Sequence, residues 1–129
     1  MDRSKIVADA NDFFQNVTIL FADIVNFTKY SGSVTAIEVV NMLRELFTAF
    51  DKLALEFNVF KLYTIGDCYV VIGLVNSQNR DHMEEARNVL KMGFAMIETI
   101  KEINAKDPKY SELNMRIGIH TVFFNFKYK

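Results

Sequence analysis

The distribution of hydrophobic and polar positions predicts four strands and two long helices. Strands are expected over residues 17–24, 59–64, 68–74 and 113–120, where β-branched and aromatic residues are concentrated. The first of these segments is apolar at almost every position up to Asp23. Such a continuous apolar run is typical of a central strand that is covered by helices on at least one side.

The helices are expected between these strands. Thr35 and Glu38 have the spacing of a capping box, in which a hydroxyl cap is followed three residues later by an acid. Apolar residues then recur at helical spacing as far as Ala54, and Asn58 is a plausible stop. A second helix is expected over residues 82–104. The polar stretch 26–33 is interpreted as a loop.

The order strand, helix, strand, strand, helix, strand predicts an α+β fold with a ferredoxin-like βαββαβ core, in which helices cover one face of an antiparallel sheet. In this topology the first and third strands are antiparallel neighbours. Asp23 ends the first strand, and Asp67 opens the third after a hairpin turn at Gly66. The fold therefore predicts that the two carboxylates lie side by side.

Two carboxylates so close together repel one another, and a divalent cation would relieve that repulsion. Hard oxygen ligands without nearby His point to Mg²⁺ or Mn²⁺ rather than to zinc. Either aspartate alone is more simply explained as a cap of a strand end or turn, but their predicted adjacency favours a metal site. Asn26, Phe27 and Thr28 follow directly, in a turn whose backbone N–H groups could bind phosphate oxygens. An ordinary connecting loop is the alternative for that turn.

Composition narrows the possible functions. The chain has 129 residues, which suits one domain, and a net charge of -1, which gives no support for nucleic-acid binding. No apolar window approaches the ~20 residues that a membrane span needs. The single cysteine, Cys68, fits a reducing compartment. We therefore expect a cytoplasmic protein, or the cytoplasmic part of a membrane-associated one.

Three ordered motifs resemble the catalytic domain of class III adenylyl and guanylyl cyclases. They are VTILFADIVNFT (17–28), YTIGDCY (63–69) and MRIGIHT (115–121). The resemblance implies a partial cyclase domain over residues 16–121, preceded by a lead-in (1–15) and followed by a divergent tail (122–129). It also implies a dimeric enzyme, of intracellular signalling, that makes cyclic nucleotides from ATP or GTP and releases pyrophosphate.

The resemblance also implies roles for individual residues. Asp23, Asp67 and the backbone carbonyl of Ile24 are similar to the ligands of two Mg²⁺ or Mn²⁺ ions. The amides around Asn26, Phe27 and Thr28 are similar to the triphosphate-binding turn. No catalytic residue beyond the metal ligands is matched. Family sites form between two catalytic domains, so the expected partners are a nucleoside triphosphate and a second cyclase domain.

The sequence departs from the family pattern at several positions. Asn26 stands where the family usually has Gly, and Tyr63 stands where it has a base-reading Lys or Glu. Tyr63 is interpreted as an aromatic residue of a dimer interface, and Lys61 is expected on the same strand face. After Thr121 nothing matches the family's Gly-rich strand or its transition-state Asn and Arg. These departures predict the metal-donating half of a dimeric site, inactive alone.

Two other functions fit the same residues. One is a catalytically silent cyclase-like module for dimerisation or regulation. The other is a different two-metal nucleotidyl enzyme with the same core, such as a diguanylate cyclase or a polymerase palm. The diguanylate version is disfavoured, because the chain lacks the Gly-Gly-Asp/Glu-Glu-Phe hairpin. The sequence does not separate ATP from GTP.

Overall fold

A computed structural model describes residues 13–74, 76, 78–107 and 113–125. The expected α+β, ferredoxin-like fold is confirmed, with one additional short helix. The elements in chain order are β1 (Phe13–Val25), α2 (Phe27–Ser33), α3 (Ala36–Glu56), β2 (Phe60–Ile65), β3 (Cys68–Ile72), α4 (His82–Lys106) and β4 (Asn114–Asn125).

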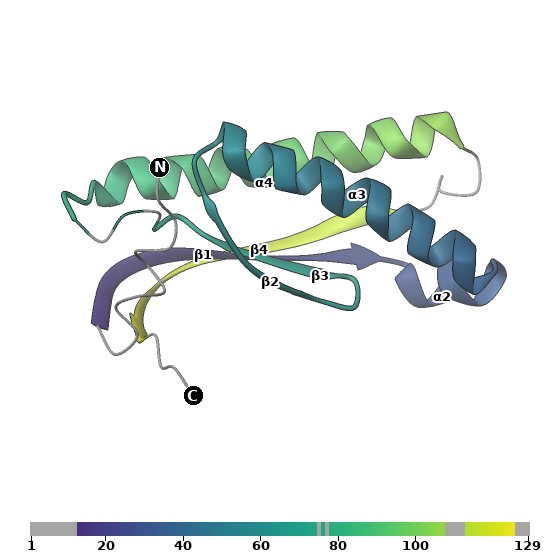
Figure 1. Cartoon of the computed structure of the whole chain (residues 1–129), viewed down its shortest axis with the longest axis horizontal. Helices are drawn as coiled ribbons and strands as arrows, with labels where there is room; N and C mark the ends of the chain where they lie inside the picture. The colour runs from purple at the N-terminus through teal and green to yellow at the C-terminus, as the bar shows by residue number, and fades with distance from the viewer. Residues whose placement is uncertain (1–12, 75, 77, 108–112, 126–129) are drawn as a thin grey trace.

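The four strands form one antiparallel sheet in the order β2-β3-β1-β4. Helices α3 and α4 lie side by side on one face of this sheet (Figure 1). Helix α4 packs over β1 and β4, whereas α3 packs beside α4 and against β2. Strands β1 and β3 are therefore central neighbours, as the order of elements predicted.

Residues of β1 alternate between the two faces of the sheet. Leu20, Ala22 and Ile24 belong to the main core, which lies between the sheet and the helices. Val17 and Ile19 belong to a smaller cluster on the opposite face. This division explains why the strand is apolar along almost its whole length. It also places Asp23, which lies between Ala22 and Ile24, on the face away from the helices.

Both long helices begin at side-chain caps. The predicted capping box of α3 is present: the Thr35 hydroxyl accepts from the N–H of Glu38, and the Glu38 carboxylate accepts from the N–H of Thr35. Asp81 caps α4 by accepting from the N–H of Glu84. Helix α3 ends just before Asn58, which adopts a left-handed conformation at φ 56°, as expected of a helix stop.

The expectation of a loop over residues 26–33 is wrong, because α2 occupies most of that stretch. Its local sequence is polar and contains Gly32, so it gives little helical signal. Tyr30 is 5% exposed and packs in the main core. Its hydroxyl donates to the carbonyl oxygen of Glu38 at 3.4 Å. Tertiary burial of this one side chain stabilises a helix that propensity does not predict.

Strands β1 and β4 are longer than predicted. A register shift lies between Phe14 and Val17 of β1, where Asn16 has a φ of 56°. This bulge breaks the alternation from which the strand start was predicted. Strand β4 continues to Asn125 and so includes residues 122–125 of the predicted tail. Residues 1–12 and 126–129 lie outside the described part of the chain, and the division into lead-in, domain and tail stays a prediction.

Candidate functional site

The structure brings Asp23 and Asp67 together, as the sequence predicted. Strands β1 and β3 pair antiparallel with Ala22 opposite Tyr69, so the end of β1 lies beside the start of β3. The N–H of Ile24 donates to Asp67 Oδ2 at 3.2 Å. Gly66, at φ 56°, makes the tight turn from which Asp67 extends. Both carboxylates therefore belong to one site.

These residues line a hollow of about 320 Å³. Its other walls come from β1, β3 and β4, and the full lining is Phe21, Asp23, Asp67, Cys68, Arg116, Ile117 and Gly118. Gly118 leaves room here, because a Cβ at that position would meet nothing within 4 Å. The hollow therefore has free space beside the two carboxylates.

The two oxygens of Asp23 have different environments. Asp23 Oδ1 is buried and has no hydrogen-bond partner among the described residues, whereas Oδ2 lies 3.6 Å from the Arg116 guanidinium. An unpartnered buried oxygen is expensive unless something else binds it. Asp23 thus borders the hollow, and its Oδ1 is an acceptor without a hydrogen-bond partner among the described residues.

Arg116 was not identified as a site residue from the sequence. The register of β1 against β4 places it directly opposite Asp23. Its side chain is 70% exposed, and it borders the same hollow. The register between the first and the last predicted strand is the signal that could have identified Arg116, because it places Arg116 opposite Asp23. Arg116 gives the hollow one positive charge beside two negative charges.

Cys68 is half-buried in the wall of the hollow. Burial and then the negative charges of Asp23 and Asp67 raise the pKa of its thiol above the ordinary value. A thiol with a raised pKa is a poor nucleophile at neutral pH. Cys68 is therefore better explained as part of the wall than as a reactive group.

Two carboxylates, those of Asp23 and Asp67, line the hollow. Within residues 13–74, 76, 78–107 and 113–125, no group of three or more His, Cys, Asp or Glu side chains is arranged to hold a metal ion. An ion bound by Asp23 and Asp67 would need its remaining ligands from backbone carbonyls, water or a bound molecule. Hard divalent cations such as Mg²⁺ commonly keep water and phosphate ligands in this way.

The predicted phosphate-binding turn is the start of helix α2. Asn26 is its N-cap residue, with φ 65° and ψ 18°, and Phe27 and Thr28 are its first two residues. This is the left-handed backbone conformation, which Asn tolerates better than most residues. The first N–H groups of a helix have no intrahelical acceptor. The turn directly follows β1 and hence Asp23.

Tyr63 and Lys61 do not share a strand face, contrary to expectation. A register shift lies between them, so Lys61 pairs with Val71 of the main core and Tyr63 pairs with Val70 of the opposite cluster. The bulge cancels the usual alternation of side chains. Lys61 is turned toward α3, where its ammonium lies 3.0 Å from Asp51. Tyr63 is 45% exposed, and its role at an interface stays a prediction.

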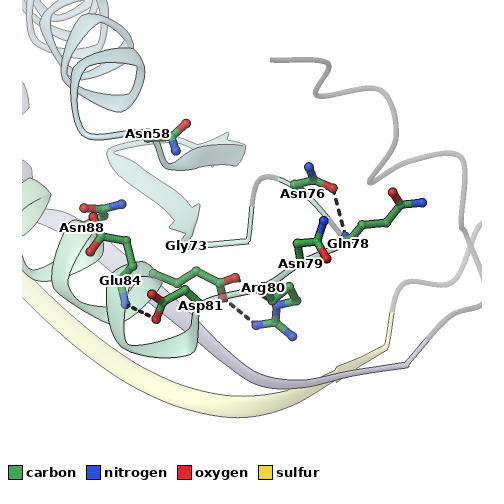
Figure 2. Close-up of a pocket in the computed structure, with 10 residues that line it drawn as sticks. Asn58, Gly73, Asn76, Gln78, Asn79, Arg80, Asp81, Glu84 and Asn88 are labelled. Atoms are coloured by element: carbon green, nitrogen blue, oxygen red, sulfur yellow. Dashed lines mark hydrogen bonds and ion pairs between the residues drawn. The ribbon is translucent and has the colours of Figure 1, made fainter.

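A second polar pocket, of about 230 Å³, lies beyond the other end of β3 and is lined mainly by amide and charged side chains (Figure 2). Arg80 and Glu85 lie at this pocket, where Arg80 donates to both oxygens of Glu85 at 3.0 and 2.6 Å. Arg80 also donates to the carbonyl oxygen of Asn16 at 3.2 Å. Both side chains are 11% exposed. This pair is satisfied and links β1, the loop before α4, and α4 itself.

Comparison with known proteins agrees with the geometry. The family model described as the adenylate and guanylate cyclase catalytic domain matches residues 10–123. The chain belongs to this family. Atrial natriuretic peptide receptor 2 of Anguilla japonica is 41% identical over 108 residues, which are 84% of this chain and 10% of that receptor. A guanylate cyclase of Toxoplasma gondii is 44% identical over 110 residues, covering 82% of this chain and 2% of that protein.

Solved cyclase structures share the fold. The dimeric guanylyl cyclase domain of the RhoGC fusion protein from Blastocladiella emersonii has a TM-score of 0.72 and 30% identity, with 86% of this chain and 60% of that chain covered. The guanylate cyclase domain of RhGC from Catenaria anguillulae, solved in complex with GTP, has a TM-score of 0.71 and 27% identity, with 86% and 58% covered. The chain thus spans less than two thirds of these solved domains and about a tenth of the receptor named above.

The chain is accordingly part of a nucleotide cyclase catalytic domain. This family membership favours the nucleotide cyclases over the other two-metal enzymes with the same core. It gives no support to the alternative of a silent dimerisation module. No helix in the described part of the chain is long and apolar enough to cross a membrane.

Proposed function

We propose that this chain supplies the metal- and triphosphate-binding half of a nucleotide cyclase active site. Asp23, Asp67 and the carbonyl of Ile24 would hold two Mg²⁺ or Mn²⁺ ions. The observation that carries the proposal is the buried, unpartnered Oδ1 of Asp23 in a hollow shared with Asp67. A divalent cation is the ligand that would satisfy this oxygen and also relieve the repulsion between the carboxylates.

The donor set fits such ions. Two carboxylates and a carbonyl are hard oxygen ligands, and no His lines the hollow. When bound, the ions would lower the pKa of the ribose 3′-hydroxyl and neutralise charge on the leaving pyrophosphate. The hydrogen bond from Ile24 N–H to Asp67 Oδ2 fixes the Asp67 carboxylate relative to β1. This contact holds the two halves of the donor set in one geometry.

The chain's own groups would orient the triphosphate. The N–H groups of Phe27 and Thr28 start α2 immediately after β1 and can donate to phosphate oxygens. The Arg116 side chain is 70% exposed and its guanidinium lies only 3.6 Å from Asp23, so it can turn from the carboxylate toward a bound phosphate. Together these groups would bind and orient the triphosphate.

The site would be completed by a second cyclase domain. Arg116 is the only cation that lines the hollow among the described residues. Tyr63 carries no charge that could read a base. We therefore expect the isolated chain to bind metal and nucleoside triphosphate without making cyclic nucleotide.

Metal binding tests the site directly. Asp23→Asn and Asp67→Asn are each expected to weaken Mn²⁺ binding about a hundredfold or more, because each removes a charged ligand. Titration of the purified chain followed by the electron paramagnetic resonance of free Mn²⁺ measures this change. Glu98→Gln, which removes the same charge from an exposed position on α4, is the matched control. Equal affinities in all four proteins would refute the metal site.

Catalysis is tested with GTP and with ATP in parallel. The chain alone should give no cyclic product, whereas mixing it with a cyclase domain that lacks its own aspartate pair should restore turnover with one nucleotide. Turnover in the mixture should be lost with Asp23→Asn. Cyclic nucleotide made by the chain alone would contradict the half-site. Metal binding without turnover in any mixture would favour the silent module instead.

A further inference from the structure

The carboxylate of Asp51, on helix α3, contacts both strands of the β2–β3 hairpin. Its Oδ1 accepts a hydrogen bond of 2.6 Å from the Tyr69 hydroxyl of β3 and lies 3.0 Å from the Lys61 ammonium of β2. The same ammonium lies 5.2 Å from the centre of the Tyr69 ring. We call these three residues the Asp51 cluster. One carboxylate oxygen therefore joins α3 to the hairpin that carries Asp67.

The Tyr69 ring is fixed against the same helix. Tyr69 is 0% exposed, and its ring centre lies 5.4 Å from that of Phe47 and 5.3 Å from that of Phe50, both of which belong to α3. Removing the acceptor of a buried hydroxyl is unfavourable, because that hydroxyl has given up its hydrogen bonds to water. Without the Asp51 carboxylate we therefore expect Tyr69, and the strand that carries it, to shift.

Tyr69 lies where β3 meets the end of β1. It pairs with Ala22, the residue before Asp23, and it follows Asp67 by two residues. The hydrogen bond of 3.2 Å from the Ile24 N–H to Asp67 Oδ2 spans the same two strand ends. A shift of β3 relative to β1 at this point would therefore change the separation of the two carboxylates.

The tip of the hairpin has little packing of its own. Residues 63–66 are exposed, and the exposed fractions of Tyr63 and Ile65 are 45% and 68%. Segments with few buried apolar contacts are the ones that open and move most easily. The position of the tip should therefore depend on contacts at its base, where the Asp51 cluster lies.

From these contacts we infer that Asp51 is a positioning residue for the proposed metal site. Through Tyr69 and Lys61 it holds the hairpin against α3, and it thereby sets the place of Asp67 relative to Asp23. The Asp51 cluster lies on the helix side of the sheet and does not line the hollow, so it acts through the strand and touches neither metal nor nucleotide. The inference rests on the proposed function, because it needs Asp67 to be a metal ligand.

Titration with Mn²⁺, followed by electron paramagnetic resonance, tests this role. Asp51→Ala should weaken Mn²⁺ binding about tenfold, as is typical of residues that orient metal ligands. Tyr69→Phe should weaken it severalfold. The double variant should bind no more weakly than Asp51→Ala, because both changes break the same hydrogen bond. Asp51→Asn removes the same charge but keeps an acceptor for the hydroxyl, so it should retain most of the affinity.

The matched control is Asp81→Ala, which removes the side-chain cap of α4 beyond the other end of β3. Loss of a cap also lowers stability, but the Mn²⁺ affinity should stay at the wild-type value. An equal loss of affinity in Asp81→Ala and Asp51→Ala would overturn the inference, because general destabilisation would then explain both. Circular dichroism checks that each variant is folded. Tyr69→Phe deletes only a hydroxyl and carries the comparison if Asp51→Ala does not fold.

A second readout needs no metal. Because the Ile24 N–H donates to Asp67, its amide resonance in nuclear magnetic resonance spectra reports where the hairpin holds that carboxylate. The resonance should shift in Asp51→Ala and Tyr69→Phe and stay in place in Asp81→Ala. An unchanged resonance in the first two variants overturns the positioning role, and so does unchanged Mn²⁺ affinity. A wild-type chain that binds no Mn²⁺ refutes the proposed function itself, and the positioning of a metal ligand with it.

Discussion

Arg80–Glu85 and Arg116–Asp23 are both arginine–carboxylate pairs, and they lie near opposite ends of β3. In the first pair both side chains are 11% exposed, and two hydrogen bonds join them, the shorter of 2.6 Å. The second is separated by 3.6 Å, and its side chains are 70% and 39% exposed. The first uses both carboxylate oxygens, whereas the second leaves Asp23 Oδ1 unpartnered.

This difference separates a structural pair from a group that is ready for a ligand. A buried pair contributes to stability only when all its hydrogen bonds are made, and Arg80 and Glu85 meet that condition. Asp23 does not, although it has a cation beside it. Residue type alone therefore does not separate the two acids; the number of their satisfied oxygens does. The following predictions test this distinction, from the largest expected effect to the smallest.

Removing the acid from the structural pair should have the largest effect. Glu85→Ala leaves the Arg80 guanidinium buried without its partner and should lower the free energy of unfolding by about 3–5 kcal/mol. Asp23→Asn, at the other pair, should change it by less than about 1 kcal/mol, because that pair is long and exposed. Urea unfolding followed by circular dichroism measures both. Similar losses of unfolding free energy in the two variants would contradict the distinction between the two arginine–carboxylate pairs.

The backbone near the two pairs should also differ in how much space it has for an added side chain. Space is tight at Gly73, near Glu85, and open at Gly118, in the hollow beside Asp23. A Cβ at Gly73 would lie 2.9 Å from the carbonyl oxygen of Glu85, whereas a Cβ at Gly118 would meet nothing within 4 Å. Gly73→Ala should therefore destabilise the fold by about 1–3 kcal/mol. Gly118→Ala should be neutral or slightly stabilising, because Ala loses less backbone entropy than Gly in a strand. Thermal unfolding of the two variants checks the contrast, which fails if Gly118→Ala is the more damaging.

Removing the arginine from the hollow should affect binding more than stability. Arg116→Ala should change the free energy of unfolding by less than about 1 kcal/mol, since exposed ion pairs contribute little. It should strengthen Mn²⁺ binding severalfold without nucleotide, because the guanidinium no longer competes for Asp23. It should weaken binding of the metal–triphosphate complex. Calorimetric titrations with and without nucleotide separate the two effects, and weaker Mn²⁺ binding in the absence of nucleotide would count against this role.

The smallest effect concerns the thiol of Cys68 in the wall of the hollow. Because burial and the charges of Asp23 and Asp67 raise the pKa of Cys68, less thiolate is present at pH 8 than in an exposed cysteine, and alkylation should be slower. Asp23→Asn removes one of the charges, so it should lower that pKa and speed alkylation by iodoacetamide. Glu85→Gln at the distant pair should not. A pH–rate profile that is identical in both variants would show that the charges do not act on Cys68.

The sequence by itself determined the order of the four strands and the two long helices, and with it the adjacency of the two aspartates. Helical and strand periodicities are local signals, and so are the capping box at Thr35 and the turn at Gly66. The ferredoxin-like topology follows from their order, and with it the contact between the end of β1 and the start of β3. The family motifs added the expected roles of these residues. The comparisons show the cyclase domain family, and the residue roles stay proposals.

Tertiary structure alone decided the features that depend on register and burial. Helix α2 exists because Tyr30 is buried in the main core, and the bulge before Tyr63 turns Lys61 toward α3. Arg116 faces Asp23 only because β4 pairs with β1 in one particular register. Such contacts join residues far apart in the chain, so no local pattern encodes them. For the same reason the sequence could place Asp23 in the site but could not show that one of its oxygens is left without a partner.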